Sequence, residues 1–287
     1  MQLDAEVARR VQRVGAAEAA ALVDAGIVVL DVRTPGEYTG LGHIPGARLL
    51  PVDLSAAAPA ILDEDAPVLV TCEHAVRSKF TARLLAQAGF SQVYELDGGM
   101  ATWSGPRAYA PAPIAGPSSW LLENADLLAG RRRALDVACG TGRHALLLAA
   151  AGFEVTAIDR DRAALDRFRR HAERLGLSVS VQESDLETAN PPSLVSETSP
   201  PFDLVVVTRY LHRPLFPRIT EAVAPDGLLF YETFLEQQAT RGAPTTPHFL
   251  LKPGELTSLV RPLVVVRQRE GDIDGAFLSA VVAGSPR

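Results

Sequence analysis

The sequence predicts two α/β domains in tandem, each built on a parallel β-sheet. The chain has 287 residues against about 150 for a typical domain, and 47% of them are hydrophobic, which is enough for two packed cores. Short apolar runs alternate with helical segments on both sides of one proline-rich stretch. Such alternation is typical of parallel sheets that helices cover on both faces.

The proline-rich stretch, residues 105–117, divides the chain into residues 1–104 and 118–287. It reads GPRAYAPAPIAGP and holds four prolines and two glycines in thirteen positions. Because proline fixes φ and lacks a backbone donor, we expect a stiff extended linker here rather than a packed element.

Strands and helices follow one another in both domains, and we predict them from the apolar runs. In the first domain we expect strands at Val28–Val32, Val68–Thr71 and Val93–Leu96, and helices at Ala17–Asp24 and Ser78–Gln87. In the second domain we expect strands at Ala134–Ala138, Val155–Asp159, Val179–Gln182, Leu204–Thr208 and Leu228–Glu232, and helices at Arg143–Ala151, Arg162–Leu175 and Arg213–Val223. The segment Asn190–Pro201 is rich in proline and serine and is expected to be a surface loop.

The composition argues against several classes of protein. With 28 Lys and Arg residues against 34 Asp and Glu residues, the chain lacks the positive field of a DNA-binding protein, and no nucleic-acid partner is expected. Two cysteines are too few for a disulfide framework. The N-terminus does not resemble a signal peptide, and the most apolar stretch, Ala145–Phe153, is too short to cross a membrane. We therefore expect a cytoplasmic protein with reduced thiols and no membrane partner.

Cys72 follows the expected strand Val68–Thr71 and begins a short loop that ends at Arg77. This order places the sulfur near the N-terminus of a helix, where backbone N–H groups and the helix dipole stabilise a thiolate or a bound anion. Arg77 can pair with that anion or hold the loop. The alternative is that Cys72 is only a buried packing residue, as free cysteines often are.

Three separated motifs resemble the rhodanese-like domain family. Leu30–Tyr38 (LDVRTPGEY) is followed by Gly42–Ala47 (GHIPGA), and Leu96–Met100 (LDGGM) with Trp103 resembles the closing segment of that family. The three motifs occur in the family's order between roughly Val14 and Trp103. Domains of this family carry sulfur as a cysteine persulfide.

The resemblance implies that Cys72 is the persulfide carrier and that Arg33 and Arg77 support it. The Cys-x4-Arg loop matches the sulfurtransferases, whereas the related phosphatases have one residue more. Glu73 and Ala75 depart from the family, in which a basic residue often follows the cysteine and a glycine often takes the fourth position. Because an acid beside the thiol opposes thiolate formation and repels thiosulfate, we expect a protein or small-molecule persulfide as the sulfur donor.

The second domain presents a glycine turn after its first strand. Ala134–Ala138 runs into Cys139–Gly142 (CGTG), and Asp159 ends the next strand. Glycine lets the backbone approach a ligand closely, and an acid in that place can accept both ribose hydroxyls of a nucleoside cofactor. The cofactor is then a nicotinamide dinucleotide or S-adenosylmethionine. A nicotinamide site usually has a third glycine, where this chain has Ala145.

Five motifs in order resemble class I S-adenosylmethionine-dependent methyltransferases, with a Rossmann-like fold, and this favours S-adenosylmethionine as the cofactor. Leu135–Gly142 is similar to motif I, and the other four are Asp159, Asp185 in ESDL, Phe202–Val207 (FDLVVV) and Val223–Leu229 (VAPDGLL). The resemblance covers Trp120 to about Glu232.

The resemblance also implies which residues bind the cofactor. Asp136 supports the turn and the methionine portion, Gly140 and Gly142 admit the cofactor, Asp159 binds ribose, Asp185 binds adenine, and Thr208 lies at the cofactor from the end of the fourth strand. For Asp136 and Asp185 the alternative role is to cap a loop or a helix.

The methyl acceptor is expected to be a small molecule. No Asn/Asp-Pro-Pro-Tyr motif follows the fourth strand, so methylation of an amino group of adenine or glutamine is not supported. The layout resembles the tellurite- and thiol-methylating branch of small-molecule methyltransferases, which implies a thiol or another chalcogen. Tyr210, His212 and His248 are candidates to orient or deprotonate the acceptor, or are ordinary packed or surface residues. No metal ligand set is expected.

The sequence therefore predicts an enzyme that joins a rhodanese-like sulfurtransferase to a methyltransferase. In the alternative hypothesis the first domain is a non-catalytic sensing or binding module that regulates the second, and persulfide formation on Cys72 distinguishes the two. A third hypothesis is that the protein is an oxidoreductase, and the identity of the bound cofactor distinguishes it from a methyltransferase. Two alternatives remain for the sulfur that leaves Cys72. In the first, it becomes the thiol that the second domain methylates, because tethering the two domains raises its effective concentration. In the second, the two domains serve one pathway without direct transfer of sulfur.

Overall fold

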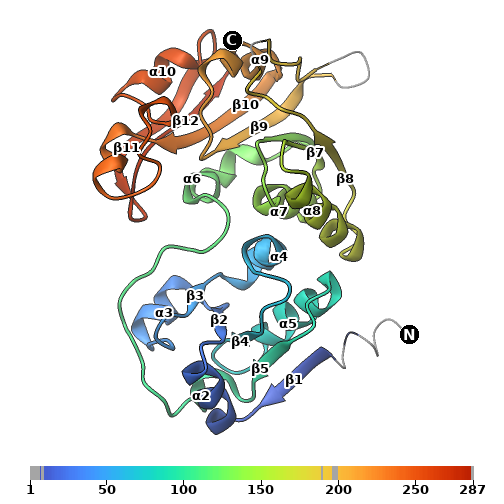
Figure 1. Ribbon diagram of the computed structural model, residues 1–287, viewed down its shortest axis with the longest axis vertical. Helices are drawn as coiled ribbons and strands as arrows, with labels where there is room; N and C mark the ends of the chain where they lie inside the picture. The colour runs from blue at the N-terminus through green and yellow to red at the C-terminus, as the bar shows by residue number, and fades with distance from the viewer. Residues whose placement is uncertain (1–6, 8–9, 189, 196–199, 286–287) are drawn as a thin grey trace. The chain divides into compact units, whose positions relative to one another are not determined.

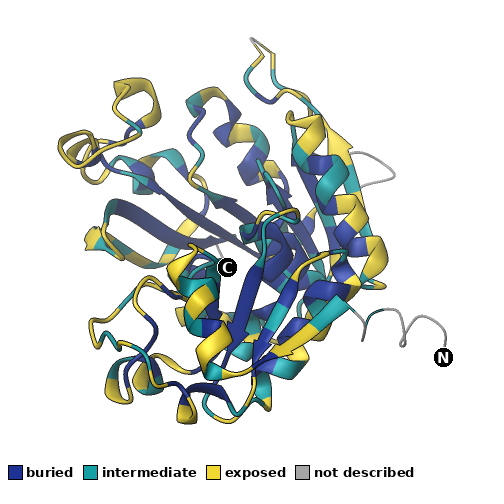
Figure 2. Ribbon diagram, turned by 60° about the horizontal axis from the view of Figure 1, so that its bottom comes forward, coloured by how far each residue is buried: buried dark blue, intermediate teal, exposed yellow. Residues whose placement is uncertain are grey.

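The computed structural model describes residues 7, 10–188, 190–195 and 200–285. The chain divides into two compact units, Met1–Pro117 with Phe168–Leu177, and Ser118–Arg167 with Ser178–Arg287. Figure 1 shows a β-sheet with flanking helices in each unit. Figure 2 shows that the inner strands are buried, while the outer faces of the helices are exposed. Within the described residues, no helix is long and apolar enough to cross a membrane.

The first unit is built on a five-stranded sheet in the order β1-β5-β4-β2-β3, with every pair parallel. Apolar side chains alternate between its two faces, so that Val29 and Leu69 pack in one core and Leu30 and Val70 in the other. The strands are β1 (Val11–Val14), β2 (Val28–Asp31), β3 (Arg48–Leu49), β4 (Val68–Thr71) and β5 (Val93–Leu96). The helices are α2 (Ala16–Asp24), α3 (Pro35–Gly40), α4 (Ala58–Ile61) and α5 (Arg77–Ala88).

The predicted elements of this unit are all present. β4 and β5 have the predicted bounds, β2 ends one residue early, and α2 and α5 start one residue early. The sequence did not predict β1, β3, α3 and α4. β1 (VQRV) lacks a continuous apolar run, β3 has two residues, and α3 and α4 are too short to show a helical period.

Residues 105–117, the expected linker, pair with the first unit at two places. Ala108 forms a bridge with His43, and Ile114 forms one with Leu49. The backbone N–H of Ala115 also donates to the Leu49 carbonyl at 2.7 Å. The segment expected to connect the domains is therefore fixed to the first unit over part of its length.

The second unit is built on a seven-stranded sheet in the order β11-β12-β10-β9-β6-β7-β8. The five strands from β6 to β10 are parallel, while β12 pairs antiparallel with both β10 and β11. The strands are β6 (Arg133–Val137), β7 (Glu154–Asp159), β8 (Val179–Glu183), β9 (Phe202–Thr208), β10 (Val223–Phe234), β11 (Val264–Ile273) and β12 (Ala276–Gly284). The helices are α6 (Ser119–Glu123), α7 (Arg143–Ala150), α8 (Arg162–Arg174), α9 (Phe216–Glu221) and α10 (Glu255–Leu259).

The five predicted strands of this unit are confirmed as β6 to β10, and the expectation of a wholly parallel sheet is corrected by β11 and β12. The predicted helix Arg213–Val223 is also shorter than expected. It consists of a 3₁₀ turn, Arg213–Leu215, followed by α9, and each of these two pieces has a proline in its first turn. Part of the loop expected at Asn190–Pro201, residues 196–199, lies outside the described residues.

The order of the strands creates a switch point between β6 and β9. From β6 the chain proceeds to β7 and β8 on one side, and then crosses to β9 and β10 on the other. Ligands of open α/β sheets bind at the carboxyl ends of the strands at such a point. The residues that follow these two strands, Ala138 and Arg209, have φ values of 56° and 54°. Positive φ is uncommon outside glycine and is frequent at functional sites.

Candidate active sites

The thiol of Cys72 lies at the end of β4 and is 1% exposed. The backbone N–H of Ser78, in the first turn of α5, donates to Cys72 Sγ at 3.3 Å. A hydrogen bond from a helix N-terminus stabilises a thiolate or a thiolate-bound sulfur. The structure therefore places the sulfur where the sequence predicted it.

Backbone hydrogen bonds from the closing segment, Leu96–Trp103, hold the cysteine loop in place. The backbone N–H groups of Met100 and Ala101 donate to the carbonyls of Cys72 and Glu73, at 2.8 and 3.0 Å. A Cβ on Gly99, which has φ of 66°, would lie 2.3 Å from the Cys72 carbonyl oxygen. Only glycine fits there, so this residue sets the close approach of the two segments.

Arg33 is wholly buried and is bound to carboxylates. Its guanidinium donates to both oxygens of Asp31, to Glu73 Oε2 at 2.7 Å and to the Gly42 carbonyl at 2.8 Å. Desolvation lowers the pKa of Arg33, but the hydrogen bonds and charges of Asp31 and Glu73 outweigh it and hold the pKa above its usual value. The negative charge of Glu73 beside the thiol is thus compensated by Arg33, which is not presented to a substrate.

Arg77 closes the loop and is paired with Glu37. Its two terminal nitrogens donate to the two oxygens of Glu37, at 2.7 and 2.5 Å. The hydrogen bond from Arg77 lowers the pKa of Glu37 to about 2. The pKa of Arg77 is raised, first by Glu37 and to a smaller degree by Cys72. Arg77 therefore lies near the sulfur, while its main contact ties α3 to α5.

A buried hydroxyl and carboxylate behind the sulfur were missed by sequence reasoning. Cys72 Sγ lies 3.3 Å from Ser78 Oγ, which donates to Glu95 Oε1 at 3.2 Å. Glu95 comes from the neighbouring strand β5 and is 1% exposed, with Arg13 Nε 3.5 Å from its other oxygen. One signal was available, because Glu95 is a charged residue inside an apolar strand. The chain of contacts gives the thiol proton a path to a carboxylate.

In the second unit, the glycine turn follows β6 as predicted. Gly140 and Gly142 have φ values of 54° and 80°, and a Cβ on Gly140 would stand in open space. Asp136 is buried beneath the turn and accepts from the backbone N–H of Ala145 at 3.1 Å. Burial raises the pKa of Asp136 to about 7, although the charge of Arg143 opposes this. Asp136 thus supports the turn from the inside.

Asp159 ends β7 and holds the glycine turn. Its carboxylate accepts from the backbone N–H of Gly140 at 2.7 Å and from that of Asp161 at 2.9 Å. A carboxylate has about four acceptor sites, so two remain for a ligand. Asp185 similarly accepts one backbone hydrogen bond, from Glu187 at 2.9 Å.

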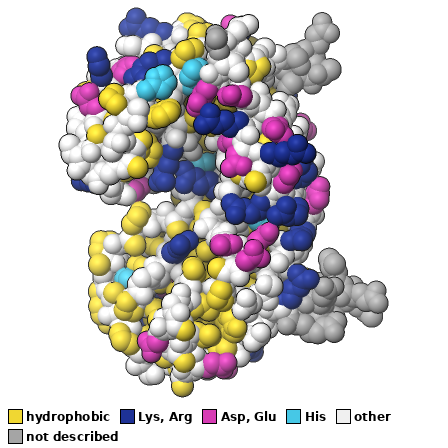
Figure 3. Space-filling view, viewed as in Figure 1, with side chains coloured by type: hydrophobic (Ala, Val, Ile, Leu, Met, Phe, Trp, Pro, Cys, Tyr) yellow, Lys and Arg dark blue, Asp and Glu magenta, His cyan; other side chains and the backbone are white. Residues whose placement is uncertain are grey.

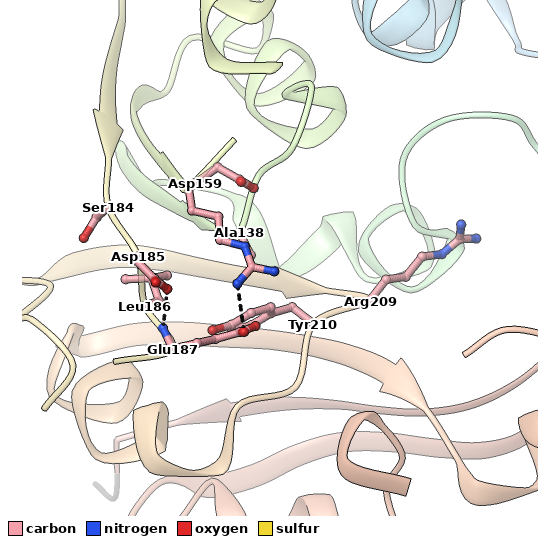
Figure 4. Close-up of a pocket in the computed structure, with 9 residues that line it drawn as sticks. Ala138, Asp159, Ser184, Asp185, Leu186, Glu187, Arg209 and Tyr210 are labelled. Atoms are coloured by element: carbon pink, nitrogen blue, oxygen red, sulfur yellow. Dashed lines mark hydrogen bonds and ion pairs between the residues drawn. The ribbon is translucent and has the colours of Figure 1, made fainter. Parts of the chain in front are cut away.

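A pocket of about 240 Å³ lies at these strand ends. In Figure 4, Asp159 and Asp185 stand on neighbouring walls, and Tyr210 lies across from them. The structure therefore brings together three residues that the sequence predicted separately. The pocket is lined by Ala138, Asp159, Arg160, Ser184, Asp185, Leu186, Glu187, Arg209 and Tyr210.

A second pocket, of about 400 Å³, shares Glu187, Arg209 and Tyr210 with the first. Its other lining residues are Leu211, Thr233, Phe234, Ala243, Pro244 and Phe249, and most of them are apolar. The Tyr210 hydroxyl is buried, and within the described part of the chain it has no hydrogen-bond partner. Burial raises the pKa of Tyr210 well above its usual value, so the hydroxyl stays protonated.

The remaining predicted residues lie away from these two pockets. His212 is 8% exposed and packs edge-on against His248, with ring centres 6.5 Å apart, while His248 itself is exposed. Thr208 Oγ1 lies 3.4 Å from Nδ1 of His144, whose Nε2 accepts from the Ser118 backbone. Burial lowers the pKa of His144 well below its usual value, so the ring is neutral. The sequence did not single out His144.

Comparison with known proteins matches each unit to a different family. The model of the rhodanese-like domain matches residues 15–106, and a methyltransferase domain model matches residues 134–227. A relative named thiosulfate sulfurtransferase GlpE, from Pseudomonas paraeruginosa, is 43% identical over 96 residues, which cover 32% of this chain and 83% of the relative. The protein of the same name from Stutzerimonas stutzeri is 39% identical over 92 residues, which cover 32% and 84%. The chain belongs to the rhodanese-like family.

The rhodanese-like domain is followed by a methyltransferase domain, and the chain is an enzyme. Among solved structures, the chain is similar to TehB from Haemophilus influenzae, with 17% identity, a TM-score of 0.49, and coverage of 59% of this chain and 63% of that one. It is also similar to a TehB-like SAM-dependent methyltransferase from Corynebacterium glutamicum, with 18% identity, a TM-score of 0.44, and coverage of 58% and 88%.

The two pockets of the methyltransferase domain differ in how many of their lining residues lie within the range that the family model matches. Every residue that lines the first pocket lies within residues 134–227. In the second pocket, Thr233, Phe234, Ala243, Pro244 and Phe249 all follow that range. The second pocket is therefore formed in part by residues that lie outside the matched range.

Proposed function

We propose that the rhodanese-like domain carries sulfur as a persulfide on Cys72. The thiolate attacks the outer sulfur of a protonated persulfide donor, R–S–SH, to form Cys72–S–SH, and the S–S bond of the donor breaks to release R–S⁻. The observation that carries this proposal is the buried Sγ at the N-terminus of α5, with the Ser78 N–H directed at it. Ser78 Oγ and Glu95 accept the thiol proton before the attack.

We further propose that the donor is a persulfide rather than thiosulfate. A thiosulfate dianion would need an uncompensated cation at the loop. Both arginines at this loop are already bound to carboxylates, Arg33 to Asp31 and Glu73, and Arg77 to Glu37. The relatives named thiosulfate sulfurtransferases make a direct comparison available.

Intact-mass spectrometry tests both points. After incubation with glutathione persulfide, the chain should gain one sulfur atom, and Cys72→Ser should gain none. Cys139→Ser is the matched control and should behave like the wild type, because Cys139 lies in the other unit and burial raises the pKa of its thiol. Labelling at Cys139 alone would leave the first domain as a binding module, and faster labelling by thiosulfate than by the persulfide would refute the choice of donor.

We propose that the methyltransferase domain uses S-adenosylmethionine and methylates a small molecule, a thiol or another chalcogen. The cofactor supplies an electrophilic methyl group. The observation that carries the proposal is the pocket at the ends of β6, β7 and β9, where open space lies before Gly140 and two carboxylates share the walls. Asp159 would bind the ribose hydroxyls, Asp185 the adenine, and the turn beneath Gly140 the methionine portion.

The second pocket is where we propose that the acceptor binds. It adjoins the first at Tyr210, whose buried hydroxyl lacks a partner in the described structure and would donate to the acceptor. A thiolate attacks a sulfonium methyl group without a strong general base, and no histidine lines either pocket. His248 would support the wall of the second pocket by packing edge-on against Phe249, and His212 would support His248 in turn.

Calorimetric titration with S-adenosylhomocysteine tests the cofactor. The wild-type chain should bind it, and Asp159→Ala should weaken binding by roughly tenfold to 150-fold, because a hydrogen bond to a charged group contributes about 1.5–3 kcal/mol. Asp161→Ala is the control, since Asp161 lies next to the same turn but outside the pocket. Binding of NADH in place of S-adenosylhomocysteine would establish an oxidoreductase instead.

A further inference from the structure

Arg209 lies at the junction of the two pockets and is not bound to a carboxylate. It follows β9, it lines both pockets, and its guanidinium lies 6.0 Å from the centre of the Phe234 ring in the second pocket. Figure 4 shows its side chain extending away from Asp185. No acidic residue of the described ranges forms an ion pair with it.

Several arginines of this unit are bound to carboxylates, unlike Arg209. On the face drawn in Figure 3, many Lys and Arg side chains lie beside Asp or Glu. Arg160, Arg213, Arg241, Arg267 and Arg269 each form an ion pair at 3.1 Å or less. An arginine without such a pair at a pocket is available to a ligand.

A second arginine adds to the positive charge. Arg143, the first residue of α7, forms no ion pair with any described residue, and desolvation and the charge of Arg209 lower its pKa. The nearby acids are engaged elsewhere, because Asp136 accepts from the Ala145 backbone and Glu232 accepts from Ser118 Oγ and Arg269. The charges of Asp136 and Glu232 raise the pKa of Arg143, but burial and the charge of Arg209 outweigh them, so its pKa is lowered overall.

The backbone holds Arg209 in this position. With φ of 54° the residue adopts a left-handed conformation, which is unfavourable for a non-glycine residue. Its backbone N–H donates to the Glu232 carbonyl at 2.8 Å, which fixes the turn after β9. The backbone therefore fixes the point from which the Arg209 side chain extends.

We propose that the methyl acceptor is an apolar or aromatic molecule with one anionic group, which Arg209 binds while Phe234, Pro244 and Phe249 hold its apolar part. The inference rests on the proposed methyltransferase activity and names the class of its acceptor. A carboxylate is the simplest such group, because the planar guanidinium binds it through two parallel hydrogen bonds.

A matched pair of probes tests the inference without knowledge of the true acceptor. The chain is saturated with S-adenosylhomocysteine, and 4-methylbenzoate and 4-methylbenzamide, which differ in charge but hardly in shape, are titrated by ligand-observed NMR. The acid should bind at least tenfold more tightly than the amide. In Arg209→Gln the two should bind within twofold of each other, and Arg209→Lys should keep part of the preference.

Arg218→Gln is the control, because Arg218 lies on α9, lines neither pocket and forms an ion pair with Glu221. It should keep the wild-type ratio. Equal binding of the two probes in the wild type, or an unchanged ratio in Arg209→Gln, would overturn the inference. So would a tenfold loss of S-adenosylhomocysteine affinity in Arg209→Gln with the probe ratio unchanged, since Arg209 would then bind the cofactor's own carboxylate. Failure of S-adenosylhomocysteine to bind the wild type would instead refute the proposed activity, and the inference with it.

Discussion

Asp136 makes the stability of the methyltransferase domain depend on pH. The carboxyl group lies at the end of β6, 1% exposed, and the backbone N–H of Ala145 donates to it. Burial raises its pKa from 3.8 to about 7, against the opposing charge of Arg143. Asp136→Asn keeps an oxygen that accepts from Ala145 but removes the ionisation.

The sign follows from proton binding. Between pH 4 and pH 7 the folded chain holds a proton on Asp136 that the unfolded chain has released, so the free energy of unfolding falls as pH rises and the full loss is present above pH 7. The shift from 3.8 to about 7 corresponds to roughly 4 kcal/mol at high pH. About 1 kcal/mol of this loss is already present at pH 4.5. The free energy of unfolding of Asp136→Asn, relative to that of the wild type, should therefore be about 3 kcal/mol higher at pH 8 than at pH 4.5. This difference corresponds to roughly 6–12 °C in Tm.

Scanning calorimetry at the two pH values measures this difference. Asp203→Asn in the same unit is the control. Burial raises the pKa of Asp203, but hydrogen bonds from the backbone N–H groups of Arg133 and Arg132 lower it, and the pKa lies below its usual value. Asp203 is ionised at both pH values, so its variant should lose a similar amount of stability at each. If the Tm difference between Asp136→Asn and the wild type is the same at pH 4.5 and pH 8, the buried carboxyl does not titrate as argued.

Four further predictions concern the rhodanese-like domain. Glu37→Gln should flatten the loss of stability that the wild type shows as pH falls from about 5 to about 2, since the lowered pKa of Glu37 stabilises the fold only while it is ionised; acid titration followed by circular dichroism measures this. Gly99→Ala should lower stability by about 1–3 kcal/mol and slow sulfur uptake, because its Cβ meets the Cys72 carbonyl; denaturant unfolding and intact mass report the two effects. Ala75→Gly should raise stability by up to about 1 kcal/mol, because φ is 55° there and glycine removes the strain at a smaller entropic cost, and an unchanged midpoint of denaturation would contradict this. If sulfur passes directly to the acceptor, a donor labelled with heavy sulfur should give a labelled methyl thioether in the wild type and none in Cys72→Ser, and equal labelling in both would exclude the transfer.

The parts of the fold that the sequence predicted are those with a local signal. Continuous apolar runs placed β2, β4 and β5 and the five parallel strands of the second unit to within a few residues. β11 was not predicted although it begins with three valines, Val264–Val266, because the rest of its ten residues includes four charges and none of its side chains is fully buried. Antiparallel strands at the edge of a parallel sheet are common. Here β12 pairs with β10, and β11 in turn pairs with β12, and no local feature of the sequence shows this pairing.

The same distinction applies to the sites. Cys72 and the glycine turn are recognisable because the required residues are adjacent in the sequence. The Ser78–Glu95 contact joins helix α5 to strand β5, and no spacing rule connects these positions. Arg33 was expected to support the sulfur, yet its guanidinium direction depends on Asp31 and on a glutamate forty positions later. Sequence reasoning identified the reactive groups, while the partners that tune them required the packed structure.

Charge distinguishes the two sites and sets a condition on their substrates. At the cysteine loop each arginine has a carboxylate partner, so the site gains nothing from a doubly charged donor. At the acceptor pocket Arg209 has no such partner among the residues that the structure describes, and its charge lowers the pKa of Arg143, so a bound anion would offset the repulsion between the two arginines. A thiol that also carries a carboxylate satisfies the second condition, and its persulfide can deliver sulfur to the first site through the neutral end of the molecule. One class of compound, the carboxylated thiols, therefore fits both sites, and testing it at each site separately requires no assumption about how the two units are arranged.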